Sequence, residues 1–194
     1  MVRKNRLPKF PEDYLNDKAE EYDSSKWMER NQKRSTLYSL QYLIDEKLND
    51  REDSGIEMSA SSLILDLGCG SGFSSVILIE NGFRVIGIDI LEDMLSKARE
   101  KKRNFDDYKD LELILADINY LPIKPNSVYH ILSISSYNFI TYGMENFGEK
   151  VKLINDTAKY LHKILKNKGR IIIEFYPKDD KELKMFNKSF INNG

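Results

Sequence analysis

The 194-residue sequence lacks the residues that would build a disulfide framework or a metal cluster. Cys69 is the only cysteine, and the two histidines, His130 and His162, stand far apart. No apolar run approaches the roughly 20 residues needed to span a bilayer. The charged start at residues 1–6 is not followed by the apolar segment of a secretory signal. We therefore expect a soluble, cytoplasmic protein that is stabilised by its core alone.

An excess of charge of one sign is also missing. The chain has 30 Lys and Arg against 31 Asp and Glu, a net charge of −1, which argues against a strongly basic, histone-like nucleic-acid binder. With 41% hydrophobic and 11% aromatic residues, the composition is not that of a disordered chain. The length suits one domain, and a chain of this size buries roughly 70% of its unfolded surface. A full hydrophobic core is therefore expected.

Short apolar runs alternate with amphipathic stretches from residue 63 onward. Strands are predicted at 63–67, 84–88, 111–115, 128–134 and 170–175, and helices at 73–81, 91–104, 149–166 and after Pro177. Strands that alternate with helices form a parallel sheet with helices on both faces, so we predict an α/β fold. Two more helices, at 12–21 and from Ser24 or Ser25 to 49, predict a helical extension over 1–55 before one compact domain over 56–194.

The most informative segment is Asp66-Leu67-Gly68-Cys69-Gly70-Ser71-Gly72, between a predicted strand and a predicted helix. Glycines let the backbone turn sharply and approach a ligand, and the helix amino terminus offers free N–H groups. Asp89 closes the next strand 21 positions after Gly68, near the spacing expected of a carboxylate that holds a ribose diol. The alternative is a tight turn without a ligand, with Asp89 and Asp117 acting only as caps.

The glycine spacing discriminates between cofactors. Phe73 stands where the dinucleotide fingerprint Gly-x-Gly-x-x-Gly needs its last glycine, which disfavours nicotinamide and flavin dinucleotides. Asp-x-Gly-x-Gly-x-Gly instead resembles motif I of the class I S-adenosylmethionine-dependent methyltransferases, and the likeness continues at 87–90 and 116–118. The resemblance implies a Rossmann-like, doubly wound, mostly parallel sheet in the strand order 3-2-1-4-5, with the family's C-terminal strands 6 and 7 missing.

The same resemblance implies the cofactor contacts. The backbone of 68–72 would surround the methionyl part of S-adenosylmethionine, Asp66 would contact its amino group, directly or through water, and Asp89 would take both ribose hydroxyls. Asp117 and the Ile118 amide would read the adenine edge. The complete implied set, with Ile90 and Met94 as apolar cover of the base, is Asp66, Gly68, Cys69, Gly70, Asp89, Ile90, Met94, Asp117, Ile118 and Ser133.

Three further segments resemble a narrower family, the small-subunit ribosomal RNA guanine-N7 methyltransferases of eukaryotes and their archaeal relatives. They are residues 14–25, with Tyr-Leu-Asn-Asp and Tyr-Asp-Ser-Ser, the Ser-Ile-Ser-Ser at 133–136, and the Glu-Phe-Tyr-Pro at 174–177. The chain departs from that family at Asn138-Phe139, where Gln-Trp is usual. The resemblance implies a ribosomal RNA substrate and a small zinc-ribbon activator protein that extends the sheet beside strand 111–115, by β-augmentation. Self-association through the last strand is the alternative partner.

Methylation of guanine N7 needs no catalytic base, because this atom carries an sp² lone pair; orientation then supplies most of the acceleration. The acceptor-pocket candidates, which we treat as catalytic, are Tyr137, Asn138 and Tyr176. Tyr137 suits stacking on a planar acceptor, and it suits a core aromatic equally well. Two alternative functions stay open: a methyltransferase of small molecules, and a cofactor-binding but inactive factor of ribosome assembly.

Basic residues gather at Lys97, Arg99, Lys101, Lys102 and Arg103, and again at Arg3, Lys4, Arg6 and Lys9. Such clusters can contact RNA phosphates. A charge run is also typical of a solvated helix face, and this alternative remains open for both clusters.

Overall fold

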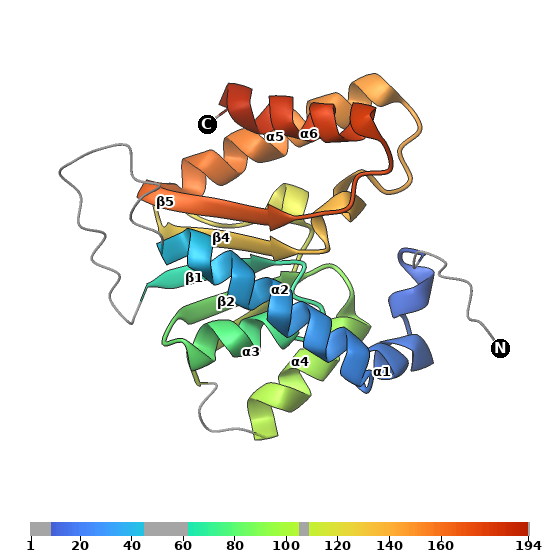
Figure 1. Cartoon of the computed structure of the whole chain (residues 1–194), viewed down its shortest axis with the longest axis vertical. Helices are drawn as coiled ribbons and strands as arrows, with labels where there is room; N and C mark the ends of the chain where they lie inside the picture. Colours follow the sequence, from blue (N-terminus) through green and yellow to red (C-terminus); the bar gives the residue numbers. More distant parts are fainter. Residues whose placement is uncertain (1–8, 45–61, 105–108, 194) are drawn as a thin grey trace.

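The computed structural model describes residues 9–44, 62–104 and 109–193 (Figure 1). In chain order the elements are η1 (Glu12–Tyr14), α1 (Asp17–Asp23), α2 (Lys26–Ile44), β1 (Leu63–Leu67), α3 (Phe73–Glu80), β2 (Arg84–Asp89), α4 (Glu92–Asn104), β3 (Leu111–Leu115), η4 (Ile118–Tyr120), β4 (Val128–Ile134), η5 (Tyr137–Thr141), α5 (Phe147–Ile164), β5 (Leu165–Glu174) and α6 (Asp180–Asn193). The η elements are short 3-10 helices. Within the described ranges, no helix combines the length and the apolar character that a membrane crossing requires.

One sheet contains all five described strands, in the order β3-β2-β1-β4-β5, and every pairing is parallel. The predicted α/β fold and strand order are confirmed. Because all strands run in the same direction, their carboxyl ends meet at one edge of the sheet (Figure 1). The strand order reverses between β1 and β4, and in open α/β sheets this is where ligands bind.

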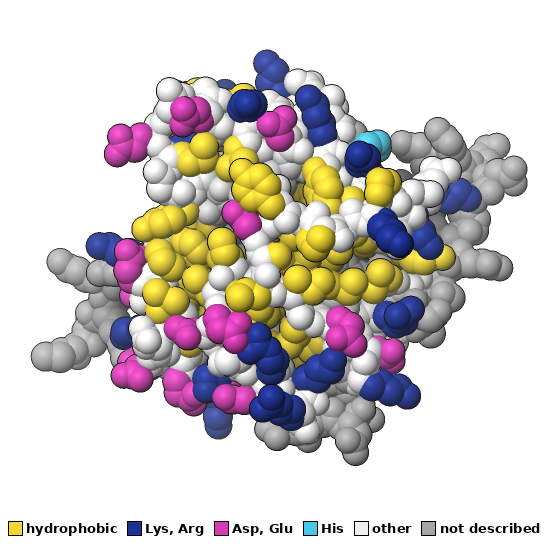
Figure 2. All heavy atoms as spheres, turned by 180° about the vertical axis from the view of Figure 1, so that it is seen from behind, with side chains coloured by type: hydrophobic (Ala, Val, Ile, Leu, Met, Phe, Trp, Pro, Cys, Tyr) yellow, Lys and Arg dark blue, Asp and Glu magenta, His cyan; other side chains and the backbone are white. Residues whose placement is uncertain are grey.

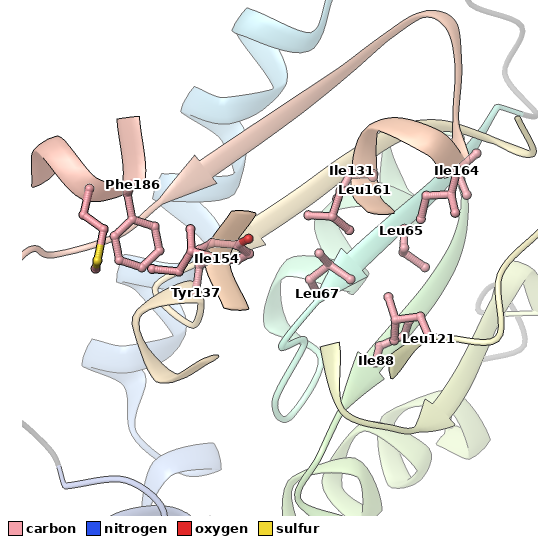
Figure 3. Packing of buried hydrophobic residues seen from close by; sticks show 12 residues of the cluster. Leu65, Leu67, Ile88, Leu121, Ile131, Tyr137, Ile154, Leu161, Ile164 and Phe186 are labelled. Atoms are coloured by element: carbon pink, nitrogen blue, oxygen red, sulfur yellow. The ribbon is translucent and has the colours of Figure 1, made fainter. Parts of the chain in front are cut away.

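Helices cover both faces of the sheet, and the alternation of side chains along β1 divides the core between them. Ile64 packs in the cluster that α2 and α3 form on one face. Leu65 and Leu67 point to the other face, where they meet α5 and α6 (Figure 3). Both clusters consist of buried aliphatic and aromatic side chains, so the carboxyl edge rests on a core that is packed from both sides.

Helix α2 is attached firmly to the sheet. Its Leu43 is fully buried, and Arg170 of β5 donates from Nη1 to the carbonyl oxygens of Tyr42 and Leu43 at 2.5 and 3.2 Å. A cation at this position stabilises the last turn of a helix. In Figure 1, α2 crosses in front of the strands. The second helix of the predicted extension therefore forms part of the layer that covers the sheet.

Some element boundaries differ from the prediction. Helix α5 ends at Ile164 and β5 begins directly at Leu165, whereas the sequence predicts a helix to 166 and a strand from 170. Val128 pairs with Leu165 but His130 with Arg170, so residues 166–169 bulge out of the ladder. This polar run has no apolar periodicity from which a strand is predicted. Residues 45–49 of the predicted second helix lie outside the described residues.

Candidate functional site

The glycine turn joins the carboxyl end of β1 to α3. Gly68, Gly70 and Gly72 have φ angles of +69°, +55° and +86°, in the left-handed region that glycine enters without steric cost. The N–H of Gly68 donates to the carbonyl oxygen of Ile88 at 2.7 Å. A Cβ at position 68 would lie 2.3 Å from the Cβ and Oγ of Ser136. Backbone and neighbours therefore fix one shape for this turn.

Asp66 lies beneath the turn and is almost completely buried. Its Oδ2 accepts hydrogen bonds from the hydroxyls of Ser74 and Ser75, both at 2.6 Å. Its Oδ1 is buried and has no hydrogen-bond partner among the described residues, and the same holds for the hydroxyl of Ser71 in the turn itself. Burial raises the pKa of Asp66 to about 6, against the opposing effect of the two serine hydroxyls. One buried carboxylate oxygen beneath the turn thus has no partner among the described residues.

Asp89, at the end of β2, connects the turn to the next helix. Its two carboxylate oxygens accept from the N–H of Gly70 and the N–H of Leu91, both at 2.9 Å. Burial raises the pKa of Asp89, and these backbone hydrogen bonds oppose the rise. Its charge also contributes to raising the pKa of Tyr14 to about 12, mainly a result of burial. A buried carboxylate therefore lies at the carboxyl edge, with an aromatic residue of η1 nearby.

Apolar groups surround this turn. A Cβ at Gly70 would lie 3.2 Å from Cε of the buried Met94, so Met94 lies directly beside the turn. Ile90 is 49% exposed and is accessible to a ligand. Cys69 is buried, its thiol packs against Gly87, where a Cβ would lie 2.9 Å from Sγ, and burial raises the thiol pKa.

Asp117 and Ile118 follow β3 at the same edge of the sheet. The N–H of Ala116 donates to the carbonyl oxygen of Asp89 at 3.0 Å, which brings this segment against the end of β2. Asp117 caps η4, because its Oδ1 accepts from the backbone N–H and the side-chain Nδ2 of Asn119 at 2.8 and 2.9 Å. Asp117 therefore acts as a helix cap, the alternative that the sequence left open. The cap uses Oδ1 of Asp117 and not Oδ2.

The serine block after β4 supports the turn from the opposite side. Ser133 and Ser136 both donate to the carbonyl oxygen of Leu67, at 3.0 and 2.7 Å, and their hydroxyls lie 2.8 Å apart. Ser133, which we assigned to the cofactor, is fully buried and uses its hydroxyl to hold the turn. This supporting role was not predicted from the sequence, nor were those of Ser74 and Ser75; the hydroxyl residues that flank the glycines were the available signal.

The carboxyl ends of β4 and β5 bring two of the three acceptor candidates together. Asn138 donates from Nδ2 to the carbonyl oxygen of Tyr176 at 2.8 Å, and Tyr176 is 60% exposed. Glu174, at the end of β5, accepts from the hydroxyls of Ser35 and Ser135 at 2.7 and 2.8 Å. It also accepts from the Tyr176 hydroxyl at 3.3 Å. Hydrogen bonds to Asn138 and Glu174 thus hold Tyr176, whose ring is accessible.

Tyr137 lies elsewhere. Its side chain is fully buried, and its ring centroid lies 5.6 Å from that of Phe186 on α6 (Figure 3). The ring of Phe190, also on α6, lies at 5.7 Å. Its hydroxyl has no partner among the described residues. Of the two interpretations that the sequence left open, the structure favours the core aromatic, and the ring is not accessible for stacking on an acceptor.

An aromatic cluster from the N-terminal segment lies beside the same edge. Phe10 stacks on Phe139 of η5 with ring centroids 4.7 Å apart. Tyr14 packs against Phe139 at 5.9 Å, and Tyr22 stacks on Phe73, the first residue of α3, at 6.0 Å. This cluster was not predicted from the sequence, although Tyr14 and Tyr22 lie in the segment that carries the family resemblance. The cluster joins η1 to η5, which follows β4, and joins α1 to α3, which follows β1.

Neither a histidine nor a metal site lies at this edge in the part of the chain that the structure describes. His130 is buried within β4, and its Nδ1 accepts from the N–H of Arg170 at 3.2 Å. Burial lowers its pKa to about 4, so it is neutral at physiological pH. The described residues contain no group of His, Cys, Asp and Glu that is suited to hold a metal ion.

The predicted basic cluster on α4 is largely neutralised. Lys97 pairs with Glu20 at 2.5 Å and with Glu100 at 3.3 Å. The other pairs are Arg99 with Glu92, Lys101 with Asp23, and Lys102 with Glu112. Two of these acidic partners lie on α1, so the cluster attaches the N-terminal helix to the domain. The structure therefore favours the charged-face alternative for α4, and residues 3–6 of the basic arm lie outside the described residues.

Comparisons with known proteins agree with this geometry. The chain is 29% identical over 143 residues to the 18S rRNA (guanine-N(7))-methyltransferase bud23 of Schizosaccharomyces pombe, a match that covers 73% of this chain and 52% of that protein. It is 28% identical over 176 residues to the 18S rRNA (guanine(1575)-N(7))-methyltransferase of Saccharomyces cerevisiae, covering 89% and 57%. The chain thus spans about half the length of these curated relatives.

Solved structures share the fold. The PH0226 protein of Pyrococcus horikoshii superposes with a TM-score of 0.59 at 23% identity, covering 93% of this chain and 66% of that chain. A geranyl diphosphate C-methyltransferase of Streptomyces coelicolor, solved with S-adenosyl-L-homocysteine, gives 0.63 at 13% identity, covering 94% and 66%. A family model described as a methyltransferase domain matches residues 58–192, which include every described strand and the whole glycine turn. This chain therefore belongs to the methyltransferase domain family.

Proposed function

We propose that this chain is an S-adenosylmethionine-dependent methyltransferase that methylates N7 of a guanine in small-subunit ribosomal RNA. The observation that carries the proposal is the free Oδ1 of Asp66, a buried acceptor beneath the glycine turn. An unpaired buried carboxylate oxygen is costly, and the ammonium group of a methionyl ligand offers it a charged donor. The residues present therefore fit this cofactor.

The remaining assignments follow the edge of the sheet. In this proposal the backbone of 68–72 surrounds the methionyl part and Asp89 holds the ribose hydroxyls through the lone pairs that its two backbone hydrogen bonds leave free. Asp117 and Ile118 lie beside Asp89, where an adenine base would extend, and Ile90 offers it an exposed apolar surface. When bound, the cofactor supplies a methyl group on a sulfonium sulfur.

The ribosomal RNA substrate rests on the names of the curated relatives and on the acceptor side of the site. Guanine N7 attacks with its own lone pair, so the reaction needs no catalytic base, and His130 is buried and neutral. We assign Tyr176 and Asn138 to the acceptor. The exposed Tyr176 ring offers a stacking surface for a base turned out of its strand, and Asn138 holds the backbone beneath it.

Methyl transfer tests the proposal directly. Purified chain, methyl-labelled S-adenosylmethionine and small ribosomal subunits lacking the modification should give label in ribosomal RNA that maps to 7-methylguanine. Asp66→Ala should abolish it. Label in small molecules but never in RNA would favour the small-molecule alternative. Cofactor binding by calorimetry without transfer to any acceptor, also when a partner is supplied, would favour the inactive assembly factor.

We also propose a small zinc-ribbon partner at the free edge of β3. In the described sheet β3 pairs only with β2, and exposed edges are usually covered. Leu115 at the end of β3 is 53% exposed, and Tyr120 of η4 is 77% exposed. Figure 2 shows hydrophobic side chains spread across one face of the molecule. A strand added by β-augmentation would pair with the edge of β3 and cover exposed apolar side chains beside it, such as Leu115.

Co-expression with a candidate zinc-ribbon protein should give a stable heterodimer that is more active than the chain alone. Leu113→Pro removes a backbone donor from β3 and should weaken the pair. A chain that is alone monodisperse and fully active would contradict the partner proposal, and dimers formed through β5 would support self-association.

A further inference from the structure

Charge is distributed unevenly along the chain. Residues 147–193, which form α5, β5 and α6, contain 11 Lys and Arg against six Asp and Glu. The rest of the chain has 19 against 25. The near-neutral total therefore hides a basic C-terminal layer. Local charge, more than net charge, decides whether a surface attracts a polyanion.

A groove of about 800 Å³ runs between α5 and α6 within this layer. One wall carries three lysines of α6, Lys181, Lys184 and Lys188, and the apolar side chains of Phe147 and Val151 of α5 line the opposite side. Asp180, the first residue of α6, is the one acidic residue in the described lining, so the groove has an excess of two positive charges. Successive residues of a helix rise about 1.5 Å, so the three lysines follow one another at about 4.5 and 6 Å along the axis. They form a row on one face of the helix. We call this row the lysine rail.

The lysine rail differs from the basic cluster on α4 in its partners. Among the described residues, none of the three rail lysines is in an ion pair. The Lys181 ammonium lies 4.0 Å from the centre of the Phe147 ring, a cation–π contact that leaves its charge uncompensated. On α4, in contrast, Lys97, Arg99, Lys101 and Lys102 each have a carboxylate partner. The α6 cations are available to an external anion.

The groove begins at the end of the molecule that holds the acceptor residues. Helices α5 and α6 both run back from the carboxyl edge of the sheet (Figure 1). Lys181 is five residues after Tyr176, and Phe147 opens α5. A strand that delivers a base to Tyr176 can therefore continue directly into the groove.

We propose that the groove between α5 and α6 binds the phosphate backbone of the RNA strand that carries the acceptor guanine. This inference rests on the proposed function and extends it to the path of the substrate. The lysine rail faces successive phosphates, and the apolar wall with Asn155 and Asn192 contacts sugars or bases. A basic groove beside apolar and amide groups is typical of single-stranded nucleic-acid binding.

The test uses the full chain and a short fluorescent oligouridylate, with binding followed by anisotropy over a range of salt. The variant is Lys181→Gln/Lys184→Gln/Lys188→Gln. Each phosphate contact on a single strand contributes about 0.7 to the slope of log K against log salt, so three contacts contribute about 2. We expect the slope to fall by about 2, and the affinity at roughly 0.1 M salt to fall about 100-fold.

The matched control removes three cations from α2, which covers the other face: Lys26→Gln/Arg30→Gln/Arg34→Gln. It should retain the wild-type slope, and both variants should bind S-adenosylhomocysteine like wild type, which excludes misfolding.

Equal losses of RNA affinity in both triple variants would overturn the groove proposal, as would unchanged RNA binding by the rail variant. Binding to anionic vesicles without binding to RNA would replace it with a membrane surface. Methylation of ribosomal RNA by the rail variant at the wild-type rate would refute the groove proposal alone. No methylation by wild type, also when a partner is supplied, would refute the proposed function.

Discussion

The two halves of the candidate site are built differently. The half at β1 and β2 consists of buried groups whose positions are fixed by backbone: Asp66 under the turn, and Asp89 between two N–H groups. The half at β4 and β5 consists of side chains at the surface. Tyr176 is 60% exposed, and the Asn138 side chain donates a hydrogen bond to the backbone carbonyl oxygen of Tyr176. The first half can hold one small ligand in one geometry, and the second is open to a large one. Substitutions in the two halves should therefore have separable effects.

The largest effect is expected from Gly68→Ala. The new Cβ would overlap Ser136 at 2.3 Å in a residue with φ of +69°, and Ser136 would have to leave the Leu67 carbonyl. We expect the free energy of unfolding to fall by about 2–4 kcal/mol and binding of S-adenosylhomocysteine to be lost. Denaturant unfolding and calorimetry measure the two effects.

Gly143→Ala is the matched control, because Gly143 has a φ of +76° but a Cβ there would meet nothing within 4 Å. It should cost about 1–2 kcal/mol, the backbone strain alone. Equal costs at the two positions would mean that the contact with Ser136 is unimportant. In the double variant Gly68→Ala/Ser136→Gly, part of the lost stability should return.

The second effect distinguishes affinity from stability. Asp66→Asn keeps an acceptor for Ser74 and Ser75 but presents an amide where Oδ1 stood. Losing a hydrogen bond to a charged partner costs about 1.5–3 kcal/mol, so the affinity for S-adenosylhomocysteine should fall about 10- to 100-fold. Thermal unfolding at pH 7 should show no loss of stability, because the variant removes a buried charge. A parallel loss of stability would indicate a purely structural role.

A smaller effect follows from the pKa of Asp66, which is raised from 3.8 to about 6. Without ligand, the folded protein binds the Asp66 proton more tightly than the unfolded chain does. Protonated Asp66 therefore contributes to the free energy of unfolding below pH 4, and this contribution is lost as pH rises through 6. Ligand binding has the opposite sign, since only the carboxylate pairs with an ammonium. The affinity for S-adenosylhomocysteine should rise about tenfold between pH 5 and 7. In Asp66→Asn this pH dependence should disappear.

The same contrast explains what the sequence could predict. Most strand positions, their parallel pairing and the glycine turn follow from local patterns, because short apolar runs alternate with amphipathic helices. The strand order was implied by the family resemblance, and the start of β5 at Leu165 was missed. The environment of Tyr137 does not follow, because its burial depends on Phe186 and Phe190, about 50 residues later. The ion pairs of α4 also depend on distant residues, Glu20 and Asp23. Buried, locally encoded groups were predictable, and tertiary partners were not.

The smallest effect, and the one most specific to the acceptor half, is expected from Asn138→Ala. Its side chain holds the Tyr176 backbone by one 2.8 Å hydrogen bond at a partly exposed position, and such a bond is worth about 1 kcal/mol. Methylation of small ribosomal subunits should fall roughly fivefold, because a misoriented acceptor loses about this 1 kcal/mol in the transition state, while affinity for S-adenosylhomocysteine stays within about twofold. Methyl transfer and calorimetry on the same preparations separate the two quantities.

Tyr137→Phe is the internal control for this last comparison. It removes a buried hydroxyl that has no partner among the described residues, so it should preserve or slightly raise stability and leave methylation unchanged. A loss of methylation in Tyr137→Phe at unchanged stability would return Tyr137 to the acceptor pocket and require a rearrangement of η5 on substrate binding. If Asn138→Ala lowers cofactor affinity as much as methylation, the two halves of the site act as one unit, and the proposed division between them is wrong.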